Sequence, residues 1–380
     1  MHIVFLLSLN NTLGGGNYSI YKFAETFALL GHTVAVFYVG KSALELSSDT
    51  NLHLCRKYDY VLRGSSIVNP ILEIIYDKLF LHPYLKKNAK KIDYIVGYQT
   101  HKGIKCVRLG KKYSIKSINF VFESPNWLMQ QLPSWKKIYD RNSKLRKLWA
   151  TYEDSLMNAN IIVAISQLTA DETENRIGRK CDLVMYPGIP NIDHTFYNKC
   201  KINQIVYVGR LEESKNVNEI IEALAQLKIK TTLVICGTGS KKSELESLAL
   251  MKNVDVVFKG AISDAEKWSE IGKSLFMVFP SSFEGFGMPP MEALLLGIPC
   301  ICTEIPIFRE VYGNCVEYFR EHDISDLCSK IQIYLENKHT LSAIGEIGRK
   351  YVTGKYGWDK SVNMLINVIG NENTCNNGQE

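Results

Sequence analysis

The sequence predicts an α/β fold built from two Rossmann-like domains. Short apolar runs alternate with longer stretches of helical periodicity along the chain, which is the pattern that a parallel sheet covered by helices requires. The chain has 380 residues, more than one hydrophobic core normally serves. Its hydrophobic content of 46% is ordinary for a soluble protein, so each half can bury a core of its own.

The predicted strands fall into two series, one for each domain. The N-terminal domain covers residues 1–190, and its expected strands are 2–9, 32–38, 94–97, 117–122, 161–165 and 183–186. The C-terminal domain covers residues 200–355, and its expected strands are 205–208, 231–236, 254–258, 275–279 and 300–302. The turn-rich segment 187–202 is expected to link them. A late helix is expected at about 356–370, followed by a polar, disordered tail over 371–380.

Composition excludes several classes of protein. The first apolar run, 2–9, is too short for a signal peptide and no basic residue precedes it, and no run reaches the length of a membrane span. The ten cysteines include no C-x-x-C pair and no histidine at zinc-site spacing. We therefore expect a cytoplasmic protein with reduced, packing cysteines and no metal site.

Charge is unevenly distributed between the two halves. Residues 1–200 contain 26 basic and 16 acidic side chains, a net charge of +10, whereas the remainder contains 19 and 23, a net charge of −4. Basic residues gather in 86–116 and in 133–149, beside Trp127, Trp135 and Trp149. Such a face fits an anionic membrane surface or a lipid-phosphate acceptor; the alternative is solvated helix faces with buried aromatic rings. No nucleic-acid motif is present, so we expect no nucleic-acid partner.

The most informative segment is residues 280–293, PSSFEGFGMPPMEA. It joins the predicted strand 275–279 to a predicted helix at 291–296. Gly285 and Gly287 let the backbone approach a ligand closely, and a helix N-terminus offers N–H groups and partial positive charge to an anion. Proline has no N–H, so the expected donors are the backbone groups of Phe286, Gly287, Met288 and Met291.

Two glutamates in this segment, Glu284 and Glu292, are separated by seven residues. They would repel a phosphate held at the loop unless they point past it to hydroxyl groups. A sugar nucleotide has hydroxyls on both sides of its diphosphate, so Glu292 is expected to accept from a ribose and Glu284 from the transferred sugar. The alternative is a glycine and proline turn whose acidic groups are solvated or cap a helix.

Two cations, Arg210 and Lys215, follow the predicted strand 204–208 and precede a helical pattern that begins near Val217. Both can therefore reach one site at the carboxyl end of that strand, where open α/β sheets bind ligands. The alternative is that they are solvated, or pair with Glu212 or Glu213 for little energy.

Two glycine-rich turns are weaker signals. Gly14, Gly15 and Gly16 follow the first strand, and Gly237 follows the strand 231–236 in a G-x-G turn. The dinucleotide fingerprint G-x-G-x-x-G is absent, which disfavours a nicotinamide dehydrogenase. For Gly237 a plain turn is the alternative.

These motifs resemble glycosyltransferase family 4, the glycosyl transferases group 1. These are retaining enzymes of GT-B fold, in which two Rossmann-like domains face each other across a cleft. The E-x7-E segment, followed in order by 297–301, Pro306 and 310–314, is similar to the family signature. Residues 207–216 resemble the family's G-R-L-x3-K segment, except that Asn216 stands where the family usually has glycine.

The resemblance implies a division of labour between the domains. The N-terminal domain would bind the acceptor and the C-terminal domain a nucleoside-diphosphate sugar, with the late helix crossing back onto the first domain. Arg210 and Lys215 would hold the donor diphosphate, above the loop of Gly15 and Gly16. The donor-site candidates are completed by Gly237, Glu284, Gly285, Phe286, Gly287, Met288 and Glu292.

The resemblance also implies catalytic candidates in the first domain. His101 follows the strand 94–97, and Glu123 follows the strand 118–122, near where the family faces its acceptor. With Glu284 they are the three catalytic candidates; for His101 the alternative is a surface or packing histidine, and for Glu123 a capping or solvated acid. No D-x-D pair is present to hold a divalent metal, so the cations and loop amides must stabilise the leaving group.

We therefore expect a metal-independent, retaining glycosyltransferase of hexosyltransferase type, active in polysaccharide biosynthesis and needing no cofactor. It would move a sugar from a nucleoside-diphosphate sugar to a glycan or lipid-linked acceptor, in the cytoplasm or peripherally on the inner face of the membrane. Two alternatives remain open, an epimerase or hydrolase of the same fold and a non-catalytic nucleotide-binding partner subunit. These motifs specify neither the base, the sugar nor the oligomeric state.

Overall fold

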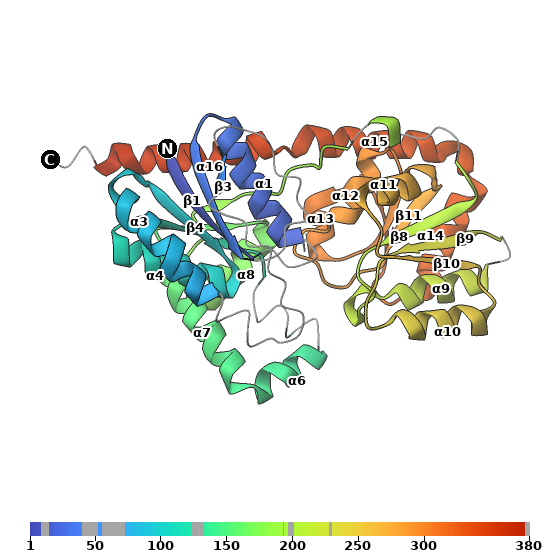
Figure 1. Ribbon diagram of the computed structural model, residues 1–380. Coiled ribbons are helices and arrows are strands. Elements are labelled where there is room, and N and C mark those ends of the chain that lie inside the picture. The colour runs from blue at the N-terminus through green and yellow to red at the C-terminus, as the bar shows by residue number, and fades with distance from the viewer. Residues whose placement is uncertain are drawn as a thin grey trace. The chain divides into compact units, whose positions relative to one another are not determined.

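The computed structural model describes residues 1–8, 15–39, 52–54, 73–123, 129, 133–192, 194–196, 201–227 and 230–376. The chain divides into two compact units, which are drawn in Figure 1 and described here one at a time. Unit 1 comprises Met1–Gly188 and Gly357–Glu380, and unit 2 comprises Ile189–Tyr356. Each unit contains one sheet covered by helices, and the paired strands are parallel.

Unit 1 has a seven-stranded sheet with the order β3-β2-β1-β4-β5-β6-β7. Its strands are β1 His2–Ser8, β2 Thr33–Val39, β3 Leu52–Leu54, β4 Tyr94–Tyr98, β5 Lys116–Val121, β6 Ile161–Ala164 and β7 Leu183–Val184. Its helices are α1 Gly15–Leu29, η1 Asp77–Leu81, α3 His82–Asn88, η2 Ala89–Lys91, α4 Gln99–Tyr113, α6 Pro133–Arg141, α7 Ser143–Met157, α8 Gln167–Ile177 and α16 Trp358–Asn376.

Unit 2 has a six-stranded sheet with the order β10-β9-β8-β11-β12-β13. Its strands are β8 Gln204–Val208, β9 Thr232–Cys236, β10 Val256–Gly260, β11 Phe276–Phe279, β12 Cys300–Thr303 and β13 Glu317–Phe319. Its helices are η3 His194–Phe196, η4 Glu213–Lys215, α9 Val217–Gln226, α10 Lys242–Lys252, α11 Asp264–Lys273, α12 Met288–Leu295, α13 Pro306–Tyr312, α14 Ile324–Glu336, η5 Lys338–Thr340 and α15 Leu341–Lys355.

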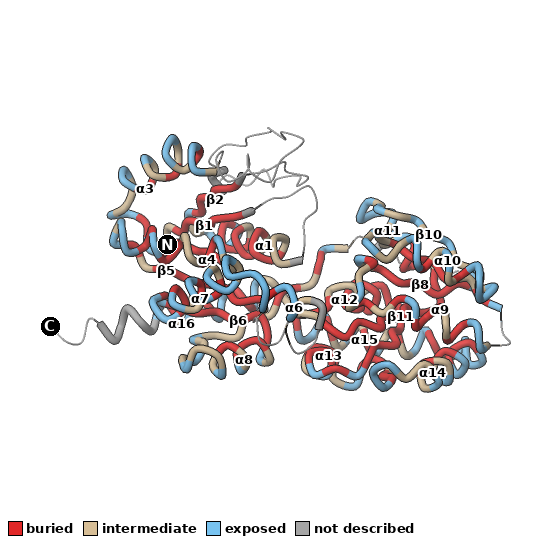
Figure 2. Tube along the Cα trace, turned by 90° about the horizontal axis from the view of Figure 1, so that it is seen from below, coloured by how far each residue is buried: buried red, intermediate tan, exposed pale blue. Residues whose placement is uncertain are grey.

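The central strands are buried on both faces, which explains why they are continuous apolar runs. From Ile3 to Leu7 no side chain of β1 is more than 1% exposed, and all five residues of β8 are buried. Figure 2 shows the central strands buried and the outward surfaces of the helices exposed. Parallel sheets are stable when helices cover both faces, and such strands have no polar side.

Strand order reverses at one point in each sheet, between β1 and β4 in unit 1 and between β8 and β11 in unit 2. At such a point the loops after the two neighbouring strands diverge to opposite faces of the sheet and leave a crevice at the carboxyl edge. Ligands of open α/β sheets bind at this position.

Some elements differ from the sequence prediction. The strands β3 and β13 were not predicted because three residues are too few to show a period. The helix α12 begins at Met288, three residues before the apolar run at 291–296, and Pro289 and Pro290 occupy its first turn, for which prolines are suited because a missing N–H costs nothing there. The helix α16 continues to Asn376, past the predicted start of a disordered tail at 371, and residues 377–380 lie outside the described residues. Once a helix is nucleated, polar residues can extend it.

The beginning of α16 is tightly packed within unit 1. The ring of Trp358 makes edge contacts with Phe23 at 5.1 Å and with Tyr18 at 6.2 Å between ring centroids. The Ser361 hydroxyl donates to the backbone carbonyl oxygen of Tyr186 over 2.7 Å. A Cβ on Gly188 would come within 2.4 Å of Trp358, so glycine is required where the chain passes this ring. None of the described helices is long and apolar enough to cross a bilayer.

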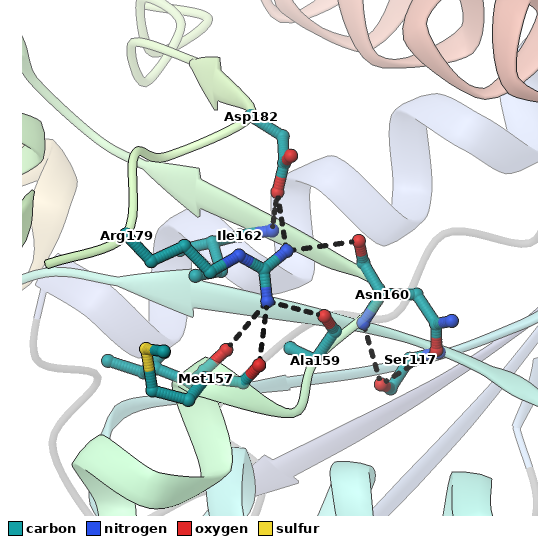
Figure 3. Close-up of polar contacts among 8 residues, drawn as sticks. Ser117, Met157, Ala159, Asn160, Ile162, Arg179 and Asp182 are labelled. Carbon is teal, nitrogen blue, oxygen red and sulfur yellow. Dashed lines mark hydrogen bonds and ion pairs between the residues drawn. The ribbon is translucent and has the colours of Figure 1, made fainter. Parts of the chain in front are cut away.

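Arg179 forms a network of hydrogen bonds at the C-terminal end of α7, as Figure 3 shows. The Arg179 guanidinium donates to the carbonyl oxygens of Leu156, Met157, Ala159 and Asn160 over 2.7–3.3 Å, and lies 3.2 Å from Asp182 Oδ2. The last carbonyls of a helix have no partner within it, so Arg179 supplies what α7 lacks. Because Asn160 leads directly into β6, the network also fixes the start of that strand.

Candidate functional site

The predicted site residues of unit 2 lie at the reversal of its sheet. The loop after β8 carries Arg210 and Lys215, and the loop after β11 carries Glu284 and leads into α12. β8 and β11 are neighbours in the sheet, so their carboxyl ends meet at one edge. The fold therefore brings together two sequence segments about 70 residues apart at the position expected for a ligand.

Lys215 forms the link between the two loops. It is only 7% exposed, and its ammonium lies 2.6 Å from Glu284 Oε1, 2.9 Å from the carbonyl oxygen of Phe283 and 3.2 Å from Ser281 Oγ. An ammonium has three N–H groups, so these three acceptors use all of them. The alternative pairing of Lys215 with Glu212 or Glu213 is not the one observed.

Asn216 stands where the family motif usually has glycine, and its backbone adopts a conformation that suits glycine. Its φ of 47° and ψ of 35° lie in the left-handed region, which glycine adopts freely and asparagine more readily than other residues. Its Nδ2 group donates to the carbonyl oxygen of Pro280 over 3.1 Å and to the hydroxyl of Ser282. Asparagine therefore keeps the backbone shape of a glycine and adds a second link between the loops.

Glu212 and Arg210, two further charged residues of the first loop, make different contacts. Glu212 accepts from the Ser240 backbone N–H over 3.2 Å and from its hydroxyl over 2.7 Å, which ties this loop to the one after β9. Arg210 is exposed, and its side chain makes no hydrogen bond or ion pair with any residue that the structure describes. Any contact of Arg210 with the donor diphosphate stays a prediction.

Gly237 has a packing function in the structure. A Cβ there would lie 1.8 Å from the backbone oxygen of Gly209, so the loops after β8 and β9 can touch only through glycine. The Leu211 N–H donates to the carbonyl oxygen of Thr238 over 3.0 Å and completes this contact. Any contact of Gly237 with a donor stays a prediction.

The N-terminus of α12 presents backbone donors next to Glu284. Gly287 precedes the helix with φ of 87° and ψ of 61°, and its carbonyl oxygen accepts from the Tyr312 hydroxyl. The N–H groups of Gly285, Gly287 and Met288 have no acceptor among the described residues. The Phe286 ring is buried against Tyr356 at 5.5 Å between centroids, so only its backbone can face a ligand.

Glu292 lies on α12 and is paired with a residue that the sequence did not indicate. The ammonium of Lys267, on α11, lies 2.9 Å from both Oε1 and Oε2 of Glu292 and 2.8 Å from Oδ1 of Asp264. Burial raises the pKa of Glu292, and the charge of Lys267 acts against that shift. The sequence places Lys267 between the predicted strands 254–258 and 275–279 and gives no signal that it would reach Glu292.

The predicted residues of unit 1 lie at the carboxyl edge of its own sheet. Gly15 and Gly16 begin α1 after β1, but residues 9–14 of that loop lie outside the described residues. His101 is exposed on the first turn of α4, directly after β4. Glu123 is half-buried, two residues after β5, and lines a small cavity with Trp149 and Arg176.

Two further features mark the reversal in unit 1. The Tyr98 hydroxyl, at the end of β4, donates to Asn17 Oδ1 on α1, which joins the elements on either side of the reversal. The backbone of Gln99, two residues before His101, has φ of 52°, a conformation that residues other than glycine and asparagine rarely adopt. The catalytic functions of His101, Glu123 and Glu284 stay predictions.

Among the residues that the structure describes, no three His, Cys, Asp or Glu side chains gather as a metal ion would require. The expected independence of metal ions stays a prediction. The cysteines whose side chains are described are free thiols, and burial raises the pKa of Cys300 and Cys302 on β12. They pack as small apolar groups.

Comparison with known proteins gives matches to glycosyltransferases. Residues 194–351 match the family described as glycosyl transferases group 1. An uncharacterized glycosyltransferase of Methanocaldococcus jannaschii is 25% identical over 210 residues, covering 54% of this chain and 58% of the relative. An O-antigen chain mannosyltransferase of Salmonella typhimurium is 29% identical over 189 residues, covering 49% and 52%.

Among solved structures, HepE of Anabaena in complex with UDP has a TM-score of 0.71 at 14% identity, over 98% of this chain and 100% of that one. This likeness shows the fold, which is GT-B. The chain spans about half the length of the curated relatives that it matches. Residues 194–351, which match the glycosyl transferases group 1 family, include both loops of the candidate site.

Proposed function

We propose that the chain is a glycosyltransferase and that unit 2 binds its donor, a nucleoside-diphosphate sugar. The observation that carries this proposal is the meeting of Lys215, Glu284 and unpaired N–H groups at the reversal of the sheet. A cation and backbone N–H groups suit a diphosphate, and carboxylates suit sugar hydroxyls. The family match supports this assignment, and so does the fold shared with HepE, which was solved with UDP.

Donor binding would require an exchange of partners at Lys215. All three of its N–H groups already have protein acceptors, so a diphosphate must replace one of them. Glu284 is the acceptor best able to leave, because its side chain is 17% exposed whereas Ser281 is fully buried. The released carboxylate could then accept from a hydroxyl of the transferred sugar.

In the proposed reaction, cationic side chains and backbone N–H groups stabilise the leaving group, and no metal ion takes part. Arg210, Lys215 and the loop N–H groups would stabilise the negative charge that develops on the diphosphate when its bond to C1 breaks. The acceptor hydroxyl would form a new bond to C1 on the same face and pass its proton to the departing phosphate, so that the configuration is retained. We expect the reaction to continue in EDTA.

We assign the acceptor to unit 1 and the candidate catalytic groups there to His101 and Glu123. Both follow neighbouring strands, β4 and β5, so the carboxyl edge of the sheet brings them toward one another. A glycan acceptor, or one linked to a lipid phosphate, is favoured by the basic surface of this unit and by the similarity to an O-antigen chain mannosyltransferase.

The test is transfer itself. Sugar conjugates of UDP, GDP, ADP and dTDP are offered with glycan and polyprenyl-diphosphate-linked acceptors, in the presence and absence of EDTA, and products are analysed by mass spectrometry and by NMR of the new anomeric centre. We expect one donor class to give an acceptor-dependent product with retained configuration, lost in Glu284→Gln. Donor consumption without an acceptor-dependent product would indicate a hydrolase or epimerase and overturn the proposal.

We also propose that the α6–α7 surface contacts an anionic membrane. This surface comprises the exposed cations Lys136, Lys137, Arg141, Lys144, Arg146 and Lys147. In Figure 1, α6 and the adjoining end of α7 extend away from the sheet of unit 1. Ile138 is 56% exposed among these cations, whereas Trp149 is buried and packs beside Trp135. Charge with an exposed apolar side chain suits the interface of an anionic bilayer, and the buried tryptophan is explained by packing.

Flotation with vesicles tests this surface. We expect the protein to float with phosphatidylglycerol vesicles at low salt and not with phosphatidylcholine. Changing Lys136, Lys137, Lys144 and Lys147 to Gln should abolish flotation. The matched variant changes the exposed Lys86, Lys87, Lys90 and Lys91 to Gln and should still float. Equal loss in both variants would assign the effect to net charge and overturn the assignment to α6–α7.

A further inference from the structure

We propose that Lys267 is a positioning residue that holds the Glu292 carboxylate in the orientation that receives the ribose hydroxyls of the donor. This inference rests on the proposed function and deepens it. It divides unit 2's site into a diphosphate part, at Lys215, and a nucleoside part, at the Lys267–Glu292 pair.

The pair is buried and its geometry is well defined. The side chains of Lys267 and Glu292 are 17% and 12% exposed, and the ammonium lies 2.9 Å from each carboxylate oxygen. Asp264, at the start of α11, accepts a further hydrogen bond from Lys267 over 2.8 Å. Most ion pairs within one helix among the described residues are more exposed, such as Lys242–Glu246, at 43% for both side chains. An exposed pair contributes little, but a buried one fixes its members.

The arrangement fixes where the Glu292 side chain can point. Lys267 belongs to α11 and Glu292 to α12, so the ammonium holds the carboxylate from one side. Lys267 is itself fixed by Asp264 and by the Trp268 ring, whose centroid lies 5.5 Å from the ammonium. Trp268 packs against Phe196 at 5.7 Å. Glu292 is therefore held by Lys267, Lys267 by Asp264 and Trp268, and Trp268 by Phe196.

The carboxylate retains the capacity to accept from a ligand. Two carboxylate oxygens offer about four acceptor positions, and one ammonium cannot fill them all. The two vicinal hydroxyls of a ribose need acceptors on one side, and the helix α12 presents Glu292 about one turn beyond the N–H groups at its start. The order along α12, with the backbone N–H groups first and the Glu292 carboxylate after them, thus matches the order of groups in a nucleoside diphosphate, in which the ribose follows the phosphates.

Charge is the second contribution of Lys267. Burial raises the pKa of Glu292, and the neighbouring carboxylate of Asp264 raises it further, whereas Lys267 lowers it. The charged groups that act on Glu292 are therefore Lys267 and Asp264, both on α11. Without Lys267 the carboxyl group would be protonated at a higher pH and would lose its strength as an acceptor of ribose hydroxyls.

The experiment compares two probes on the same variants. Isothermal titration measures binding of pyrophosphate, which has no nucleoside, and of the nucleoside diphosphate that wild type binds most tightly among UDP, GDP, ADP and dTDP. In Lys267→Met we expect affinity for the nucleoside diphosphate to fall at least about tenfold and affinity for pyrophosphate to stay unchanged. Lys267→Arg should restore most of the loss.

The control variant is Lys273→Met. Lys273 also lies on α11 and pairs with Glu270 at 2.9 Å, and Glu270 keeps a second cation, Lys259, at 3.2 Å. This variant should bind both probes as wild type does. A fall in the affinity of Lys267→Met for both probes equally would show a general structural effect and overturn the inference.

A double-mutant cycle distinguishes positioning from packing. If Lys267 acts through Glu292, adding Lys267→Met to Glu292→Gln should weaken nucleoside diphosphate binding no further. An additional tenfold loss in the double variant would overturn the inference. Lys267→Met should also move the acidic limit of nucleoside diphosphate binding to higher pH. Failure of wild type to bind any nucleoside diphosphate would instead overturn the proposed function, on which this inference depends.

Discussion

Lys215 donates to Glu284 over 2.6 Å, and this ion pair joins the loop after β8 to the loop after β11. The two residues are far apart in the sequence, and the reversal of strand order brings them together. Each is a charged side chain held in place by the other at the edge where a ligand is expected to bind. Their pairing therefore contributes to the stability of unit 2 and prepares the proposed donor site.

Replacing Lys215 by Met should destabilise unit 2. The substitution leaves Glu284 without its cation and removes a donor from the carbonyl oxygen of Phe283, so we expect a loss of about 2 kcal/mol in the free energy of unfolding. Urea unfolding followed by circular dichroism measures it. Lys241→Met, which removes an exposed pair with Glu244, should leave the unfolding curve unchanged. Equal stability of Lys215→Met and wild type would show that the pair contributes nothing.

Asn216 allows the backbone and the side chain to be tested separately. Asn216→Gly keeps the left-handed conformation but loses the bonds to Pro280 and Ser282, and we expect a cost of about 1 kcal/mol. Asn216→Ala loses the same bonds and adds the strain of a Cβ at φ of 47°, for about 1 kcal/mol more. Thermal unfolding should rank wild type above Gly and Gly above Ala. An Ala variant as stable as the Gly variant would contradict this account of the loop.

Acid should weaken unit 1 through Glu73. Burial by itself raises the pKa of Glu73, but Lys102 and Lys105, at 2.7 and 2.8 Å, outweigh it and lower the pKa from 4.5 to about 2. A carboxyl whose pKa is depressed on folding adds stability above its unfolded pKa and loses it as pH falls through the folded value. We expect the free energy of unfolding of wild type to drop between pH 4.5 and about 2. Glu73→Gln should show a smaller drop, and identical pH profiles would refute the assignment.

The Arg179 network should stabilise unit 1. Arg179→Ala removes donors from the last carbonyls of α7 and the partner of Asp182, and we expect a loss of about 2 kcal/mol. Lys180 is the matched control, because it is adjacent, 83% exposed and 4.0 Å from Glu174. Chemical unfolding should separate the two alanine variants clearly. If Arg179→Ala unfolds together with Lys180→Ala, the network has no net effect on stability.

The sequence predicted the fold because the central strands are long, apolar and bounded by glycine or proline, as at 275–279 before Pro280. The strands β3 and β13, of three residues each, left no period to detect. The sequence also predicted that Lys215 and Glu284 would reach one edge. It could not predict that they bind each other, since nearer acids such as Glu212 and Glu213 compete in any argument from spacing.

The ion pair of Lys267 with Glu292 is a second contact that the sequence could not predict. On the sequence it is one of several charged residues between the predicted strands 254–258 and 275–279, and nothing distinguishes it from Lys273. Only the packing of α11 against α12 makes Lys267 the partner of Glu292 and leaves Lys273 with Glu270. Long-range pairing of this kind follows from tertiary structure, whereas glycine, proline and strand signals act locally.

The most direct test of the central claim is thermal unfolding of wild type and Lys215→Met with UDP, GDP, ADP, dTDP, their sugar conjugates and NAD. A ligand that binds only the folded state raises the midpoint, by an amount that grows with its concentration relative to Kd. We predict that nucleotides of one base stabilise wild type and leave Lys215→Met unchanged. Stabilisation by NAD alone, by no nucleotide, or equally in both proteins would contradict a donor site built around Lys215 and Glu284.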